Sequence, residues 1–140
     1  MSTQPIVIER TFNVSPTRLW QALTKSEQMK QWYFDLPGFK AEPGYEFSFY
    51  AGRDEKKFLH LCKVIEVIPG KKLTHSWRYD GYPGDSIVSF ELFPEGENTR
   101  LRLTHSGLET FGDNPDFAKS NFVEGWTNII VKRLQKHLEA

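Results

Sequence analysis

Residues 59–79, LHLCKVIEVIPGKKLTHSWRY, decide the fold. This stretch contains two runs rich in β-branched, leucine and aromatic residues, one on each side of Pro69-Gly70. Because a proline-glycine pair ends a strand and begins a turn, Leu59–Ile68 and Leu73–Tyr79 are predicted to be neighbouring antiparallel strands. The second run alternates large side chains with small or charged ones, which indicates that one face of the sheet is buried.

Further strands are expected on both sides of this hairpin. The same two-residue alternation of side chains occurs in the segment that begins at Tyr45, in Asp85–Phe93 and in Thr99–Ser106. Together with the hairpin they predict a meander of five strands joined by short turns. Ile6–Val14 is also rich in β-forming residues and is predicted to be the first strand.

Two short helices are predicted directly after the first strand. Ser15-Pro16 supplies a preferred N-cap and a proline at the first helical position. Ser26 is predicted to cap the second short helix, which ends near Trp32.

A long helix is predicted to begin at Asn114-Pro115 and to continue to the C-terminus, a length of roughly 37 Å at 1.5 Å per residue. Gly125 interrupts its middle, where glycine costs about 1 kcal/mol relative to alanine, and is expected to mark a bend or a close backbone approach. The inward face is predicted from side chains at helical spacing, namely Phe122, Trp126, Ile129, Ile130, Arg133, Leu134 and Leu138.

The strand register can be predicted as well. If Tyr79 pairs with Ser86 and Pro94 pairs with Thr99, then Trp77, Val88 and His105 form one row across three strands. This row lies on a largely apolar face, and a sheet with one apolar face needs a cover. The long C-terminal helix is the expected cover, which predicts an α+β fold.

The composition indicates one class of protein and argues against others. The 140 residues predict a single domain, residues 1–140. Lys+Arg and Asp+Glu number 18 each, so the formal net charge is zero, which argues against nucleic-acid binding and polybasic membrane targeting. No apolar run has the length of a membrane span, and the first ten residues lack the features of a secretory signal. With Cys62 as the single cysteine, a reducing, cytoplasmic location is expected.

Several stretches resemble a known family. They are SPTRLWQALT (15–24), Gln31-Trp32, CKVIEVIPGKKLTHSW (62–77), NTRLRLTHSGL (98–108) and EGWTNIIVKRLQKHLE (124–139). In this order they resemble the START/SRPBCC superfamily, and within it the family related to the C-terminal domain of the activator of the heat-shock-protein-90 ATPase. The resemblance implies a helix-grip fold, in which a curved antiparallel six-stranded sheet, two short helices and a long C-terminal helix surround a cavity. Cys62 replaces a glycine common in the family and is expected to narrow that cavity.

The resemblance implies that the cavity holds a hydrophobic small molecule, whereas the residues alone are equally compatible with a packed aromatic core. The candidate ligand-binding residues face the predicted interior. They are Trp32, Phe47, Phe49, His75, Trp77, Phe90, His105, Phe122, Trp126 and Ile130.

The inward-facing histidines have two interpretations. His75 and His105 either orient a ligand or transfer protons, or they are core residues paired to nearby groups. The strands that carry His75 and His105 are separated by one other strand. This places the two histidines roughly 9–10 Å apart, too far to share a metal ion. Glu66 faces inward beside His75 if Ile68 pairs with Leu73, and faces solvent if the register slips by one residue.

The remaining candidate residues concern metal binding, an anionic ligand group and the cavity mouth. His60 and Cys62 are the nearest approach to a metal motif, and neither a metal site nor a cofactor is expected. Arg133 either reaches a ligand's anionic group or extends toward the helix end. Loop side chains that could cover a cavity mouth, or simply anchor their loops, are Phe34, Phe39, Tyr82 and Phe111.

Three functions are therefore compatible with the sequence. The first is binding of an apolar or amphipathic small molecule. The second, implied by the resemblance, is a co-chaperone role, in which the protein docks on a heat-shock-protein-90-type chaperone and stimulates its ATPase. The third is a cyclase- or hydrolase-type enzyme with His105, His75 or Glu66 as acid or base. A homodimer formed through an exposed strand or helix is compatible with each.

Overall fold

The computed structural model describes residues 4–52 and 57–139. They form one six-stranded antiparallel sheet in the order β1-β6-β5-β4-β3-β2, which confirms the predicted meander and places the first strand beside the last. The strands are β1 (Ile6–Phe12), β2 (Glu46–Ala51), β3 (Phe58–Ile68), β4 (Lys72–Tyr79), β5 (Ser86–Glu95) and β6 (Asn98–Ser106).

Helical segments occupy the connections and the C-terminus. The two short helices are α1 (Pro16–Thr24) and α2 (Ser26–Trp32), and the two 3₁₀ turns are η1 (Leu108–Phe111) and η2 (Pro115–Phe117). The C-terminal helix is continuous through α3 (Lys119–Thr127), the π-helical segment η3 (Asn128–Leu134) and α4 (Gln135–Glu139). No helix among the described residues combines the length and the hydropathy that a membrane span requires.

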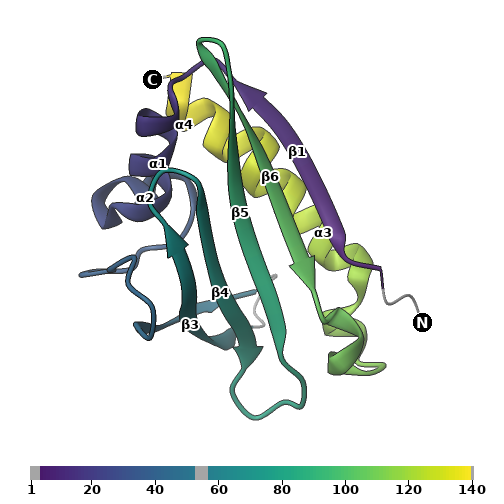
Figure 1. Ribbon diagram of the computed structural model, residues 1–140. Coiled ribbons are helices and arrows are strands. Elements are labelled where there is room, and N and C mark those ends of the chain that lie inside the picture. The colour runs from purple at the N-terminus through teal and green to yellow at the C-terminus, as the bar shows by residue number, and fades with distance from the viewer. Residues whose placement is uncertain (1–3, 53–56, 140) are drawn as a thin grey trace.

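The layers follow the predicted α+β helix-grip architecture. Figure 1 shows the C-terminal helix lying along one face of the curved sheet, with α1 and α2 beside its far end. β5 and β6 alternate buried and half-buried residues along most of their length, so the inward side chains of both strands meet the helix. The core therefore lies between the sheet and the helix.

The predicted pairing of β4 with β5 is wrong by two residues. Trp77, not Tyr79, pairs with Ser86, so the row that contains Val88 and His105 begins with His75. The physical reason is the loop after β4, where Gly84 has a φ of 104° and packs against Thr110 too closely for a Cβ atom. A shift of two leaves every side chain on its predicted face, and the predicted pairing of Pro94 with Thr99 is confirmed.

The register between β3 and β4 resolves the position of Glu66. The turn pairs Ile68 with Lys72, and the register shifts between Val64 and Glu66 because of an irregularity in the ladder. Glu66 consequently lies on the outer surface, where its carboxylate is 3.1 Å from Nζ of Lys72. The alternative in which Glu66 faces inward beside His75 is wrong.

The helix starts differ from prediction at two places. Asn114-Pro115 begins only the 3₁₀ turn η2, because Ala118 is extended, with ψ at 143°, and the long helix starts at Lys119. The N-cap of α2 is Lys25, whereas Ser26 is its first helical residue. The first short helix is capped as predicted, since the Ser15 hydroxyl accepts a hydrogen bond from the Arg18 amide.

An aromatic cavity between the sheet and the C-terminal helix

A cavity of about 200 Å³ lies between the strands β2 to β4 and the helix α3. Most of its wall is aromatic, and polar side chains are few. The lining residues are Phe34, Ala51, Gly52, Phe58, His60, Trp77, Tyr79, Asp116, Phe117, Asn121, Phe122, Gly125, Trp126 and Ile129.

His60 lies in the wall of this cavity, surrounded by rings. The Phe49 ring stacks on it with centroids 4.5 Å apart, and Trp77 and Tyr79 present their rings nearly edge-on at 4.8 and 4.7 Å. Burial lowers the pKa of His60 to about 4, although its hydrogen bonds to backbone carbonyls oppose the shift. The imidazole is therefore neutral near pH 7, and Nδ1, 2.9 Å from the Phe58 carbonyl, carries the proton.

Trp77 and Tyr79 are joined across the same wall. The indole Nε1 of Trp77 donates a hydrogen bond to the Tyr79 hydroxyl at 2.9 Å. The two residues are two positions apart on β4, so both point into the interior. Burial raises the pKa of Tyr79, which keeps its hydroxyl protonated.

His105 belongs to a fully assigned hydrogen-bond chain. An indole N–H can only donate, so Nδ1 of His105, 2.9 Å from Nε1 of Trp126, must be the acceptor nitrogen. Nε2 then carries the proton and donates to the Ser86 hydroxyl at 2.8 Å, which in turn donates to the Trp77 carbonyl at 2.6 Å. Burial lowers the pKa of His105 to about 3. Both ring nitrogens are thus engaged: Nδ1 joins β6 to the helix α3, and Nε2 joins β6 to β5.

His75 has a separate environment. Its Nδ1 lies 2.8 Å from the Ser76 carbonyl, and burial lowers its pKa to about 4. It lines a second void of about 10 Å³, a space comparable with one water molecule. That void is also lined by Tyr33, Phe47 and Phe90.

Gly125 forms the helix side of the main cavity. A Cβ atom added there would meet nothing within 4 Å outside the helix itself. Of the two expectations for Gly125, a bend or a close backbone approach, the close approach is wrong, because the space beside Gly125 belongs to the cavity.

The ten predicted site residues fall into three groups. Trp77, Phe122 and Trp126 line the main cavity. Phe49, His105 and Ile130 are buried beside these voids without lining either one. The residues that line the smaller void are Trp32, Phe47, His75 and Phe90.

Sequence reasoning missed several lining residues. Phe58 and His60 share the inward face of β3 with Cys62, so the alternation of that strand could have found them. Phe117 could not be found, because its segment was expected to be regular helix. Arg133, expected on the inner helix face, is exposed.

The loop side chains also have defined places. Phe34 lines the main cavity, and Phe39 lines the smaller void. Tyr82 contacts the rings of Phe58 and Phe117.

The described residues contain no group of three or more His, Cys, Asp or Glu placed to hold a metal ion. Cys62 is a buried free thiol whose pKa is raised by burial, which makes it a poor nucleophile.

Solved structures share this architecture. Protein MLL2253 from Mesorhizobium loti is 27% identical, with a TM-score of 0.80 and 97% of each chain covered. Protein CV1439 from Chromobacterium violaceum is 19% identical, with a TM-score of 0.79 and 99% of each chain covered. DynU16, from the dynemicin biosynthetic locus, is 19% identical with a TM-score of 0.81, and the match covers 99% of this chain but 48% of DynU16. A search of curated proteins finds no match.

The fold and the cavity define an α+β helix-grip protein with an aromatic cavity between its sheet and its C-terminal helix. The model of one family, described as Activator of Hsp90 ATPase homolog 1-like protein, matches residues 13–139. The chain belongs to this family, and through it to the START/SRPBCC superfamily that its motifs predicted.

Proposed function

We propose that this protein binds a small, flat, largely apolar molecule in the cavity between the sheet and α3. The observation that carries the proposal is a 200 Å³ space with a mostly aromatic wall. Ligand sites are typically concave and apolar with a few polar groups, and this composition matches that pattern.

The size of the cavity limits the ligand. Typical ligand pockets occupy roughly 300–1,000 Å³, whereas an apolar cavity of roughly 150 Å³ holds benzene. A cavity of about 200 Å³ therefore suits one ring or a fused pair of rings. A long acyl chain would need the surrounding rings to move.

Gly125 supports the proposal independently. Glycine inside a helix costs about 1 kcal/mol relative to alanine. Here the backbone has ordinary helical geometry, so an alanine would fit without strain. Glycine at position 125 leaves open space in the cavity wall. A role in ligand binding gives a reason for this space, whereas a purely structural role gives none.

The electrostatics of the wall favour an uncharged ligand body. His60 is neutral near pH 7, and the Tyr79 hydroxyl stays protonated. Aromatic faces attract flat rings through stacking and edge contacts. The polar side chains Asp116 and Asn121 also line the cavity and would face any polar substituent.

The experiment is native mass spectrometry on gently purified protein, followed by titration with naphthalene while tryptophan fluorescence is recorded. Trp77 and Trp126 line the cavity, so occupancy should change the emission. Gly125→Leu should fill the cavity and abolish the change. The matched control is Val123→Leu, since Val123 is exposed on the same helix. An unchanged naphthalene affinity in Gly125→Leu would refute the proposal.

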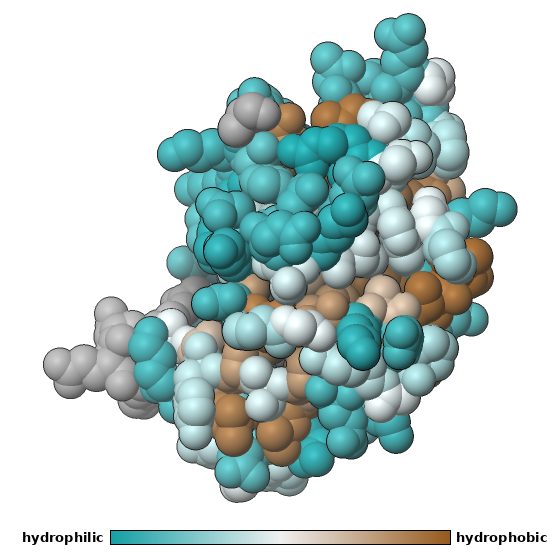
Figure 2. Space-filling model, turned by 90° about the vertical axis from the view of Figure 1, so that its left-hand side faces the viewer, coloured by the Kyte–Doolittle hydropathy of each residue, from teal (hydrophilic) through white to brown (hydrophobic). Residues whose placement is uncertain are grey.

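Docking on a chaperone and enzymatic turnover are the alternatives. The large exposed apolar side chains of the described residues are Val7, Tyr50, Ile65, Ile68, Tyr82 and Val123. Ile65 and Ile68 share β3, whereas the other four lie on different parts of the fold. Figure 2 shows apolar surface divided by hydrophilic residues, so the surface favours no single docking face. For an enzyme, the exposed Glu66 and the fully engaged His105 are poorly placed as acid and base.

A further inference from the structure

Tyr33 carries an unexplained polar group. Its side chain is 3% exposed, and among the described residues its hydroxyl is the buried side-chain polar atom without a hydrogen-bond partner. A buried hydroxyl that has lost water and gained no partner destabilises the fold, because its desolvation is uncompensated. Such a group indicates a hydrogen-bond partner that is not part of the protein chain.

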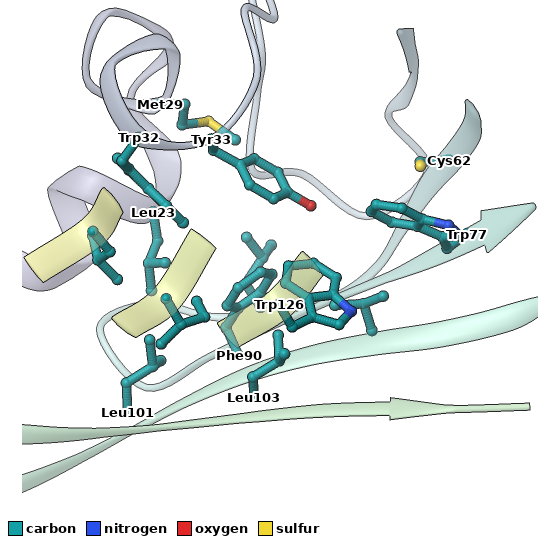
Figure 3. Packing of buried hydrophobic residues seen from close by; sticks show 14 of the residues in the cluster. Leu23, Met29, Trp32, Tyr33, Cys62, Trp77, Phe90, Leu101, Leu103 and Trp126 are labelled. Carbon is teal, nitrogen blue, oxygen red and sulfur yellow. The ribbon is translucent and has the colours of Figure 1, made fainter. Parts of the chain in front are cut away.

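The direction of the hydroxyl relates it to the cavity. Figure 3 shows the Tyr33 oxygen pointing toward the indoles of Trp77 and Trp126. Both indoles line the main cavity, and the Tyr33 ring lies nearly parallel to that of Trp126, with centroids 6.1 Å apart. Tyr33 itself lines the smaller void, and from there its hydroxyl points toward these two indoles of the main cavity wall.

A second phenol belongs to the same region. The Tyr79 hydroxyl accepts the Trp77 N–H and retains a proton of its own to donate. Burial raises the pKa of Tyr33, and the nearby Cys62 and Tyr79 raise it further. Both hydroxyls are therefore neutral donors at pH 7.

Phe34 separates Tyr33 from the open cavity. Its ring lines the cavity and lies 4.5 Å from the ring of Tyr33. We expect a ligand to reach the hydroxyl by displacing the Phe34 ring, which also stacks on Phe49 at 4.1 Å. Displacement of this ring would open a path from the main cavity to the Tyr33 hydroxyl.

We infer that the Tyr33 hydroxyl is the polar recognition group of the cavity and binds a hydroxyl or carbonyl oxygen carried by a flat aromatic ligand. This inference rests on the proposed binding function. It adds the ligand class, an oxygen-bearing aromatic such as a phenol, and the residue that selects it.

The test compares two probes of nearly equal shape, naphthalene and 2-naphthol, on the wild type and on Tyr33→Phe. The wild type should prefer 2-naphthol by roughly tenfold, as one buried hydrogen bond provides. Tyr33→Phe should abolish most of this preference, and the ratio of the two affinities is the readout. The same variant should melt at a higher temperature without ligand, because it removes an unsatisfied hydroxyl. The matched control is Tyr50→Phe, at a hydroxyl-bearing side chain that is 70% exposed.

The outcomes separate this inference from the function on which it rests. If neither probe binds the wild type, both are wrong. If both probes bind and Tyr33→Phe keeps the wild-type preference, cavity binding stands and the role of Tyr33 is overturned. Phe34→Ala supplies a second readout, since a freed passage should speed 2-naphthol association, and an unchanged rate would contradict the access route.

Discussion

Nε1 of Trp126 donates a hydrogen bond to Nδ1 of His105 at 2.9 Å, which ties the C-terminal helix to the last strand of the sheet. The same histidine passes its other proton to Ser86 on β5. One ring therefore links α3, β6 and β5, and the position of the helix over the cavity depends on it.

His105→Leu should lower the free energy of unfolding by about 2–4 kcal/mol, because it leaves the Trp126 N–H without a partner in the core. Urea denaturation measures this loss. Thr104→Val, on the opposite face of β6, should change the value by less than about 1 kcal/mol and serves as the control. A loss in His105→Leu no larger than in the control would contradict the structural role assigned to the chain of hydrogen bonds.

Stability should fall as the solution is acidified below about pH 6.5. Burial lowers the pKa of His60 and His75 to about 4 and that of His105 to about 3, so the folded protein resists protonation that the unfolded chain accepts near 6.5. The unfolded state therefore binds more protons between pH 6.5 and 3, and stability rises with pH across this window. The stability lost through one imidazole is complete below its folded pKa and amounts to roughly 3 kcal/mol for His60 or His75 and roughly 5 kcal/mol for His105.

Urea denaturation at a series of pH values checks this dependence. Replacement of His75 by Gln should flatten the slope between pH 6 and pH 4, since that residue no longer titrates. A free energy of unfolding that stays constant from pH 7 to pH 4 would show that the three imidazoles are not buried in their neutral form.

Gly125→Ala should have opposite effects on stability and on binding. The helix gains up to about 1 kcal/mol, because alanine is the better helix former and its Cβ meets no atom within 4 Å. The added methyl group enters the cavity and should weaken naphthalene binding several-fold. Thermal melting and fluorescence titration measure the two effects, and Val123→Ala is the exposed control on the same helix. Stabilisation without weaker binding would mean that the ligand does not contact the helix wall.

Glu66→Gln should have little effect. Its ion pair with Lys72 is largely exposed, and such pairs contribute about 0–1 kcal/mol. Ligand binding should be unchanged, because Glu66 lies on the outer surface of the sheet. The measurements are urea denaturation and the naphthalene titration. Any loss of binding beyond twofold would return Glu66 to the list of functional residues.

Much of the fold was predictable because it depends on local pattern. Alternation along Leu73–Tyr79 and Thr99–Ser106 places the right side chains inside, and the helical spacing of Phe122, Trp126 and Ile130 identifies the covering helix. The errors occur where tertiary contacts override local signals. The pairing of β4 with β5 moves by two residues beside the loop in which Gly84 packs on Thr110, and Asn114-Pro115 starts only a 3₁₀ turn.

The sequence by itself determined the fold class, the meander of five strands, the buried faces and the family, since each follows from the periodicity of neighbouring residues or from ordered motifs. Only the tertiary structure decided what each buried polar group does. His105 is engaged by Trp126 and Ser86, 21 and 19 residues away, whereas His60 lines the cavity and the hydroxyl of Tyr33 has no partner. Hydrogen-bond partners and cavity walls come from segments far apart in the chain, and no local pattern records which of them meet.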